Sequence, residues 1–324
     1  MSTFAASAGP SPSRATRRLQ VPVLAAAHLL PLAILALPGG LHLQQELAAA
    51  SASHQPIRIN LLRRESERPV RFVHARTVAG LVAVFDKAAF TLPMVGRGKP
   101  VPRLYVKAVP VDIRRIKQTS VKKSVFIRSV LPLVLRVNEE ILRQRTRLQR
   151  LAGRADADLS NTDRAWLTGL ARQYGLKTAS IPALLKRVDV VPPSLAIAQA
   201  IVESGWGTSL AARRGNALFG QMSYGKGARG IAIMQGRVRA RIAGFDSLLA
   251  ATRAYVLNLN SHPAYSAFRQ SRARLRAARQ RLSGHVLAGS LLRYSELGIR
   301  YVRYIQGAIR IERLGRFDTA VLKS

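Results

Sequence analysis

Glu203 is the side chain in this sequence best placed for acid–base chemistry. It is the only carboxylate within residues 192–221. On a helix starting at Pro193, it lies in the last turn beside Ala200 and Ile201, where burial and the negative end of the helix dipole both raise a carboxyl pKa. A carboxyl that stays protonated near neutral pH is what a general acid in glycosidic-bond cleavage requires.

A simpler interpretation of Glu203 competes with this one. A carboxylate at a helix end also forms ordinary solvated ion pairs, and Arg213 and Arg214 follow within the same segment. Trp206 favours the acid hypothesis, because an indole near the carboxyl adds apolar cover. Residue chemistry alone leaves both interpretations open.

The elements that must position Glu203 are mostly helical. The apolar periodicity predicts seven helices, over residues 121–152, 162–174, 193–204, 247–259, 269–282, 285–292 and 301–310. The glycine-rich stretch 220–244 predicts a small hairpin with strands near 230–234 and 238–243. Upstream, a short strand is expected at 80–85 and a linker at 93–102. The fold class is therefore mainly α, with a minor β element after the Glu203 helix.

The composition constrains the partners. The chain has 52 Lys and Arg against 16 Asp and Glu, a formal net charge of +36. Such a surface attracts polyanions, whether nucleic acid, anionic lipid or anionic wall polymer. There is no cysteine, which excludes disulfides, zinc–thiolate sites and thiol nucleophiles.

The N-terminal residues help to choose among these polyanions. Arginines precede an apolar run at 21–38, and small residues follow at 48–53. This order is typical of an export signal in residues 1–53, with an uncleaved inner-membrane anchor through 21–38 as the alternative. We expect a periplasmic or cell-envelope location, which makes nucleic acid an improbable partner. Residues 54–101 are interpreted as an Arg-rich linker, and residues 102–324 as the functional domain, with its catalytic core at about 160–310.

Cofactor and metal signals are weak. The six histidines show no ligand spacing, so no metal site is expected. Two glycine patterns within residues 220–230 resemble nucleotide loops, but neither has the flanking strand and helix that phosphate binding needs. We expect no cofactor.

Several motifs in the same order resemble one family. Ala200-Ile-Val-Glu203-Ser204-Gly-Trp206-Gly207 and Asn216-Ala-Leu218-Phe219-Gly220 resemble the motifs of peptidoglycan-cleaving glucosaminidases of glycoside hydrolase family 73, which includes FlgJ-type enzymes and autolysins. Residues 245–248, 255–265, 291–296 and 301–302 are similar to motifs of the Bax-like branch of glucosaminidase-domain proteins. The resemblance extends over about residues 102–310.

The resemblance implies a lysozyme-like fold, in which a helical lobe and a small β-hairpin lobe enclose a glycan groove. By the same resemblance Glu203 is the general acid and Tyr294 the aromatic residue near the reacting sugar. It also implies contacts to the glycan from Trp206, Asn216, Phe219, Tyr265 and Glu296. For Phe219 and Tyr265 a core position is the favoured interpretation.

The chain departs from the family in its acids. Some relatives carry a second carboxylate on the β-lobe, whereas this sequence has no Asp or Glu between Glu203 and Asp246. We expect Asp246 to cap the next helix. Help from the substrate's N-acetyl group, or from Glu296, would complete the chemistry. The alternative for Glu296 is an ion pair with Arg300 on the protein surface, four residues further along the chain.

The expected activity is an N-acetyl-β-D-glucosaminidase acting on peptidoglycan. A lytic transglycosylase is an alternative, because it also uses one Glu. A catalytically weak basic protein that binds the cell wall is another. The expected partners are peptidoglycan glycan strands, together with anionic envelope polymers or the membrane surface.

Overall fold

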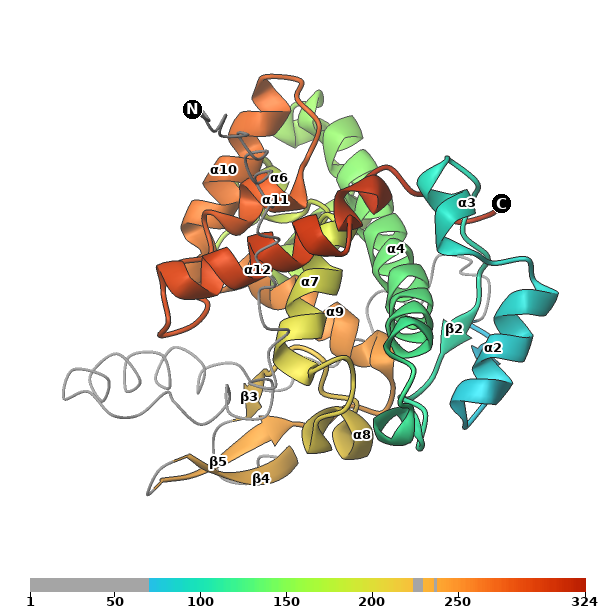
Figure 1. The fold of residues 1–324 in the computed structure, drawn as a ribbon. Helices are drawn as coiled ribbons and strands as arrows, with labels where there is room; N and C mark the ends of the chain where they lie inside the picture. The colour runs from blue at the N-terminus through green and yellow to red at the C-terminus, as the bar shows by residue number, and fades with distance from the viewer. Residues whose placement is uncertain (1–69, 224–229, 236–237) are drawn as a thin grey trace, which may run out of the picture.

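The computed structural model describes residues 70–223, 230–235 and 238–324 of the chain. The described residues form a mainly helical body with a small antiparallel sheet at one end (Figure 1). The helices are α2 (Val78–Lys87), α3 (Leu92–Gly96), α4 (Thr119–Ala152), α5 (Asn161–Gln173), α6 (Ile181–Arg187), α7 (Pro193–Ser204), α8 (Leu210–Gly215), α9 (Leu248–Ser261), α10 (Ser266–Ala277), α11 (Gly284–Ala288) and α12 (Ile299–Ile311). This confirms the expected mainly α class with a minor β element.

Two small sheets accompany the helices. β3 (Met222–Ser223), β4 (Gly230–Gln235) and β5 (Val238–Ala243) form one antiparallel sheet in the order β3-β5-β4. It lies directly after the Glu203 helix in the chain, where the glycine-rich segment predicts a hairpin. β1 (Phe72–Val73) and β2 (Tyr105–Val106) form a short parallel pair. The single-turn helices are η3 (Ile113–Arg115), η4 (Asp156–Asp158), η5 (Pro263–Tyr265) and η6 (Leu314–Phe317).

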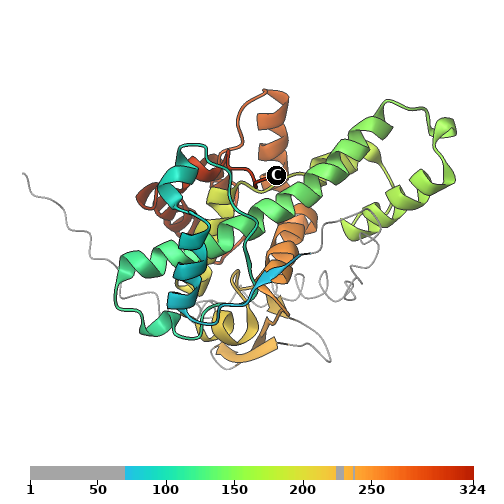
Figure 2. The same cartoon turned by 90° about the vertical axis from the view of Figure 1, so that its right-hand side faces the viewer.

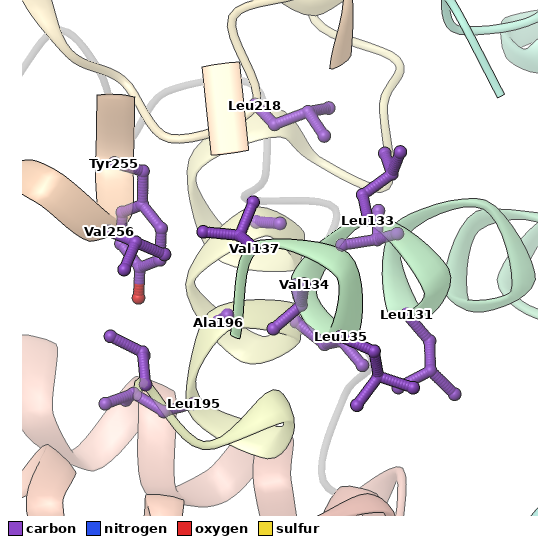
Figure 3. Packing of buried hydrophobic residues seen from close by; sticks show 14 of the residues in the cluster. Leu131, Leu133, Val134, Leu135, Val137, Leu195, Ala196, Leu218, Tyr255 and Val256 are labelled. Carbon is purple, nitrogen blue, oxygen red and sulfur yellow. The ribbon is translucent and has the colours of Figure 1, made fainter. Parts of the chain in front are cut away.

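The α7 helix lies at the centre of the helical body. Every residue from Pro193 to Ile201 is buried, which explains why its sequence is almost continuously apolar. α4, α11, α12 and η6 pack around it, and Figure 3 shows Val134 and Val137 of α4 beside Ala196 of α7. The long α4 helix crosses the molecule from one side to the other (Figure 2). Glu203 is thus carried on a helix that neighbours hold on all sides.

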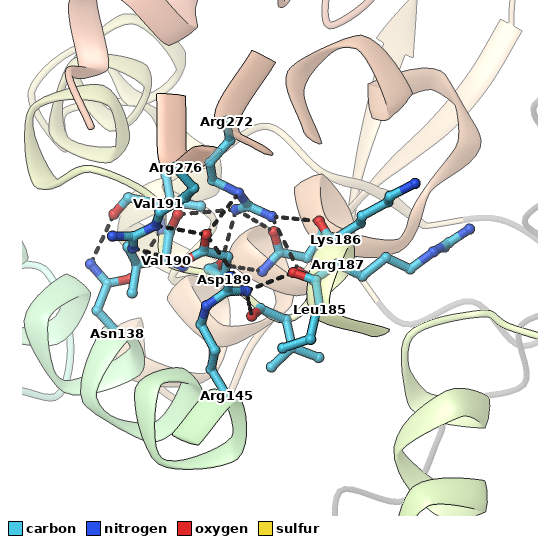
Figure 4. Close-up of polar contacts among 12 residues, drawn as sticks. Asn138, Arg145, Leu185, Lys186, Arg187, Asp189, Val190, Val191, Arg272 and Arg276 are labelled. Atoms are coloured by element: carbon cyan, nitrogen blue, oxygen red, sulfur yellow. Dashed lines mark hydrogen bonds and ion pairs between the residues drawn. The ribbon is translucent and has the colours of Figure 1, made fainter. Parts of the chain in front are cut away.

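A buried cluster of charges fixes the chain just before α7. Asp189, which is 2% exposed, accepts two hydrogen bonds from Arg276, at 3.1 and 2.9 Å. Arg145 and Arg272 lie 3.7 and 3.9 Å from its Oδ2, and the same arginines donate to main-chain carbonyls of residues 185–190 (Figure 4). Burial by itself raises the pKa of Asp189, but the hydrogen bond from Arg276 and the charges of Arg272 and Arg145 outweigh it and lower the pKa below its ordinary value. Helices α4, α6 and α10 are therefore tied to the loop that leads into α7.

The first turn of α7 has its own anchor. Asp318, near the C-terminal end, accepts from the amide and the hydroxyl of Ser194, both at 2.8 Å. It also accepts from the amide of Gly284 at 3.0 Å. One carboxylate therefore gives a partner to a first-turn N–H group of α7 and to one of α11, groups that have no partner within their own helices. Burial raises the pKa of Asp318, and these hydrogen bonds oppose the rise.

The expected linker is wrong for residues 70–101. The expected strand at 80–85 is the helix α2, whose Leu81 and Phe85 are fully buried, and the expected linker at 93–102 contains α3. A short apolar run looks alike in a buried strand and in a buried helix, and burial against α4 favours the helix here. Residues 54–69 lie outside the described residues, and the boundary at 102 stays a prediction.

The structure also bears on the expected cap of α9 and on the search for a membrane-spanning helix. The cap of α9 is Ser247, whose hydroxyl accepts from the Ala250 amide at 3.1 Å, and not Asp246, which is exposed. Within the described ranges no helix combines the length and apolar character needed to cross a membrane. The expected export signal or anchor, residues 1–53, lies outside the described residues.

The Asp189 cluster predicts a large stability effect. Replacing Asp189 by Asn leaves the buried Arg272 without its counter-charge, and breaking such a pair costs ~3–5 kcal/mol. We expect a loss of that size in the free energy of unfolding, measured by urea denaturation. The matched control is Asp158→Asn in η4, an exposed site where the change stays within about 0.5 kcal/mol. Equal effects of the two substitutions would contradict the role given to the cluster.

Candidate active site

Glu203 lies in the last turn of α7 as a half-buried residue. Its Oε1 accepts a hydrogen bond from the Tyr301 hydroxyl of α12 at 2.8 Å. Burial raises the pKa of Glu203 to about 7, and the Tyr301 hydrogen bond partly opposes that rise. The carboxyl group is therefore near half-protonation at neutral pH, as a general acid requires. Arg213, a candidate ion-pair partner from the sequence, donates from its Nε to the Thr208 carbonyl instead.

The conformation of the turn after Glu203 explains why two glycines flank Trp206 in the motif at 200–207. Gly205, Trp206 and Gly207 have φ values of 57°, 60° and 78°, a left-handed run that glycine adopts easily and tryptophan does not. The Ser204 hydroxyl closes the turn by accepting from the Gly207 amide at 2.9 Å. The chain is thereby reversed immediately beyond the acid, so that α7 ends at the site.

Gly220 forms the wall on the other side of the Glu203 carboxyl group. A Cβ placed on Gly220 would lie 2.7 Å from Glu203 Oε2, and the φ of Gly220 is 63°. Only glycine satisfies both the contact and the backbone conformation. The last residue of the Asn216–Gly220 motif thus has a direct physical link to the acid.

The other residues of that motif hold this wall in place. Asn216 ends α8 in a left-handed conformation, and its Nδ2 donates to the Phe245 carbonyl at 2.9 Å. Phe219 is 2% exposed and stacks on Tyr255, with ring centroids 4.0 Å apart. Phe219 therefore has the core position that was favoured for it. Binding of substrate by Asn216 or Phe219 stays a prediction.

A buried polar chain behind Glu203 was missed in the sequence. The Tyr255 hydroxyl donates to Gln199 Oε1 at 2.6 Å, and Gln199 Nε2 donates to the Tyr301 hydroxyl at 2.9 Å. Gln199 lies one turn before Glu203 on α7, and it is fully buried. The one available signal was a glutamine within an apolar helix, and its partners lie 56 and 102 residues further along the chain.

Tyr294 lies against this chain but does not contact Glu203 through a hydrogen bond. Its ring stacks on Tyr301 at a centroid distance of 5.3 Å, and its hydroxyl donates to the Phe219 carbonyl at 3.1 Å. Tyr265 lies next to it, with centroids 5.6 Å apart. The structure thus brings Tyr294 and Tyr265 into the aromatic group around the acid, while Tyr301 is the direct partner. A catalytic role for Tyr294 stays a prediction.

The Trp206 ring is packed against side chains of α4 rather than left exposed for stacking on a sugar. Its ring meets Phe126 of α4 edge-on at 5.7 Å, and the Lys123 ammonium lies 5.2 Å from its ring centroid. Lys123 in turn bonds Glu312 at the end of α12. Trp206 therefore links the turn after Glu203 to α4, and its expected contact with a glycan stays a prediction.

Among the described residues, no second carboxylate hydrogen-bonds to Glu203 or to the tyrosine that donates to it. The segment from 204 to 245 has no Asp or Glu, and Asp246 beyond it is exposed. Glu296 is an exposed residue in the turn before α12, two positions from Tyr294. A role for Glu296 in binding or catalysis stays a prediction.

Comparisons with known proteins give the family context. The family model for glucosaminidase, described as mannosyl-glycoprotein endo-beta-N-acetylglucosaminidase, matches residues 179–306. The protein Bax of Escherichia coli (strain K12) is 38% identical over 200 residues, which are 60% of this chain and 71% of Bax.

Two solved domains give weaker structural matches. The catalytic domain of the autolysin Auto from Listeria monocytogenes aligns at 18% identity with a TM-score of 0.33, covering 54% of this chain and 97% of that domain. A glycoside hydrolase domain of FlgJ from Salmonella typhimurium aligns at 21% identity with a TM-score of 0.30, covering 45% and 97%.

The matched family region contains α7, the small sheet and all of the aromatic group from Tyr255 to Tyr301. The identity to Bax extends over more than two thirds of that protein. This chain belongs to the glucosaminidase family, together with Bax, and is a glycoside hydrolase.

Proposed function

We propose that this chain hydrolyses the glycan backbone of peptidoglycan, on the reducing side of N-acetylglucosamine, with Glu203 as its general acid. The observation that carries the proposal is the carboxyl group of Glu203, whose pKa burial raises to about 7. It is held at a helix end, between the Tyr301 hydroxyl and Gly220. The family match supports the bond type. The resemblance of the Glu203 and Asn216–Gly220 motifs to those of peptidoglycan-cleaving glucosaminidases supports the choice of a cell-wall substrate.

The proposed reaction needs one enzyme acid. Glu203 gives its proton to the glycosidic oxygen as the bond to the anomeric carbon breaks. The oxygen of the substrate's own N-acetyl group then attacks that carbon, a known route among glycosidases that lack a carboxylate nucleophile. Water opens the resulting ring and returns a proton to Glu203. The absence of any Asp or Glu from 204 to 245 supports this route over a pair of carboxylates.

The charge of the chain suits an anionic wall. A net charge of +36 attracts phosphate- and carboxylate-bearing envelope polymers at long range. We further propose that the protein is exported and acts in the cell envelope, on the basis of the apolar run at 21–38 and the arginines before it. Wall binding would then concentrate the enzyme at its substrate.

A lytic transglycosylase is the second candidate, because it too proceeds with one acid. In that reaction the sugar's own hydroxyl attacks, and the product is an anhydro-muropeptide with no reducing end. Mass analysis of the released fragments, before and after borohydride reduction, separates the two reactions. We expect fragments that gain two hydrogens on reduction. Fragments that do not react would assign the chain to the second candidate.

Loss of the Glu203 proton donor predicts a large loss of rate. Glu203→Gln keeps the size of the side chain but donates no acidic proton, so we expect kcat to fall by about 10²–10⁴-fold. The assay is release of reducing ends from purified peptidoglycan. Asp246→Asn, at the exposed acid next along the chain, is the control and retains the wild-type rate. Unchanged release by Glu203→Gln would overturn the proposal.

The contact at Gly220 predicts a specific catalytic defect. Gly220→Ala places a methyl group 2.7 Å from Glu203 Oε2, so the carboxyl group must move and kcat falls. Gly98→Ala is the matched control. Gly98 has a φ of +95°, and a Cβ added there would meet no atom within 4 Å. Both substitutions cost roughly 1–2 kcal/mol of stability through the left-handed backbone. Only Gly220→Ala should slow glycan cleavage, and equal activities would refute the contact's role.

The raised pKa of Glu203 predicts two pH effects. kcat/KM should fall as the pH rises through about 7, since the acid loses its proton there. Stability follows the same group: between the ordinary pKa of 4.5 and about 7, the unfolded chain binds fewer protons than the folded one, so wild-type stability falls with rising pH. Glu203→Gln lacks this dependence. Parallel urea titrations of both proteins across pH 4–8 measure the difference, and parallel curves would contradict a raised pKa.

A further inference from the structure

The hydrogen-bond chain that leads to Glu203 consists of three buried residues, Tyr255, Gln199 and Tyr301. Tyr255 and Gln199 are 0% exposed and Tyr301 is 2% exposed. The order is Tyr255 hydroxyl to Gln199 Oε1, Gln199 Nε2 to Tyr301 hydroxyl, and Tyr301 hydroxyl to Glu203 Oε1, at 2.6, 2.9 and 2.8 Å. Buried polar groups of this kind stabilise a single arrangement when every member has its partner.

The amide of Gln199 gives this chain a direction. An amide nitrogen has hydrogens to donate and no lone pair to accept with, whereas the amide oxygen only accepts. Tyr301 must therefore accept from Gln199 Nε2, which leaves its one hydroxyl hydrogen for Glu203 Oε1. Tyr255, donating to the amide oxygen, holds the amide in this orientation, and the stacked Phe219 ring at 4.0 Å holds Tyr255.

The direction of the chain has a consequence for the acid. An oxygen that accepts from Tyr301 is the better carbonyl oxygen of a neutral carboxyl group, so the carboxyl hydrogen belongs on the other oxygen. That oxygen is Oε2, the one beside Gly220, at the entrance to the segment that continues into β3.

We propose that Gln199 is a positioning residue that fixes the direction of this hydrogen-bond chain, so that Glu203 Oε1 always accepts and Oε2 carries the transferable proton. The proposal rests on the role of Glu203 as the acid in the proposed function. Gln199 itself does not touch the substrate. It acts through Tyr301, and it prevents the tyrosine from turning round to accept the proton that the glycosidic oxygen should receive.

The surroundings of Glu203 make the effect measurable. In the part of the chain that the structure describes, the titratable groups that interact with Glu203 are the hydroxyls of Tyr255 from α9, Tyr294 from the turn before α12 and Tyr301 from α12. Burial raises the pKa of all three well above the ordinary value, so they stay neutral throughout the range in which Glu203 titrates. A change in the Glu203 titration therefore reports on hydrogen bonding rather than on a neighbouring charge.

The test is the pKa of Glu203 in the free protein, measured by ¹³C NMR of carboxyl-labelled glutamate and assigned with Glu203→Gln. Tyr301→Phe removes the donor to the carboxylate, and we expect the pKa to rise by about one unit. Gln199→Met keeps the volume but frees Tyr301 to turn, so we expect a smaller rise. In the double variant the pKa should equal that of Tyr301→Phe alone, because Gln199 acts only through Tyr301.

Two results would overturn the proposal. One is an unchanged pKa in Gln199→Met. The other is a shift from Gln199→Met that is equally large in the Tyr301→Phe background, which would indicate a general effect on packing. Neither result depends on catalysis, so failure of the proposed function would appear separately, as unchanged activity in Glu203→Gln.

A second variant covers the case in which Gln199→Met does not fold. Tyr255→Phe removes one hydroxyl and leaves the stacked ring, but it frees the Gln199 amide to turn over. We expect the Glu203 pKa to rise in this variant, and kcat for glycan cleavage to fall while KM stays near the wild-type value. A wild-type pKa in Tyr255→Phe would contradict the assigned direction.

Discussion

Removal of water from the Glu203 carboxyl group is the interaction on which the rest of this structure depends. An ionised carboxylate loses much hydration free energy when it is buried, and this cost raises the pKa of Glu203 to about 7, so that the protonated form persists up to neutral pH. The environment that achieves this consists of tyrosine hydroxyls and rings rather than of arginines, although arginine and lysine are abundant elsewhere in the chain. A guanidinium group next to Glu203 would stabilise the anion and remove the acid. Within the described ranges, the one side chain that forms a hydrogen bond with Glu203 is therefore a tyrosine, and no basic group contributes to the shift of its pKa.

Residues of the motifs that resemble the family hold the fold together as well as form the site. Asn260 donates to the Asp189 carbonyl and accepts from Arg272, so a residue of the Bax-like motif at 255–265 belongs to the buried charge cluster that leads into α7. Asn216 and Gly220 fix the segment on the far side of the acid. The motif residues thus lie in two shells, one that holds α7 and one that encloses its last turn.

The sequence predicted the elements whose start and length it marks clearly, and it failed for a short apolar run without such marks. The α7 helix from Pro193 to Ser204 and the strands β4 and β5 lie where the sequence placed them. The helix α2 was expected as a strand, because a short run that is apolar throughout shows no period. Glu203 was recognised from its local surroundings, but its partner Tyr301 lies 98 residues away and is joined only by tertiary packing. The Arg213 alternative was local, and in the structure Arg213 bonds to the main chain instead.

The C-terminal end of the described chain is joined to the segment between α3 and β2. Val101 and Leu322 form a parallel bridge, with the Val101 amide donating to the Val321 carbonyl and the Lys323 amide to the Val101 carbonyl, each at 2.8 Å. Arg103 Nε reinforces the closure by donating to the Lys323 carbonyl at 2.7 Å. The chain from 101 to 322, which includes α7, is thereby closed into a loop, and fraying of the C-terminal end must break this bridge first. Both partners of this bridge lie outside the region 179–306 that the family model matches, so removal of the last residues would leave main-chain groups of Val101 without partners far from the acid.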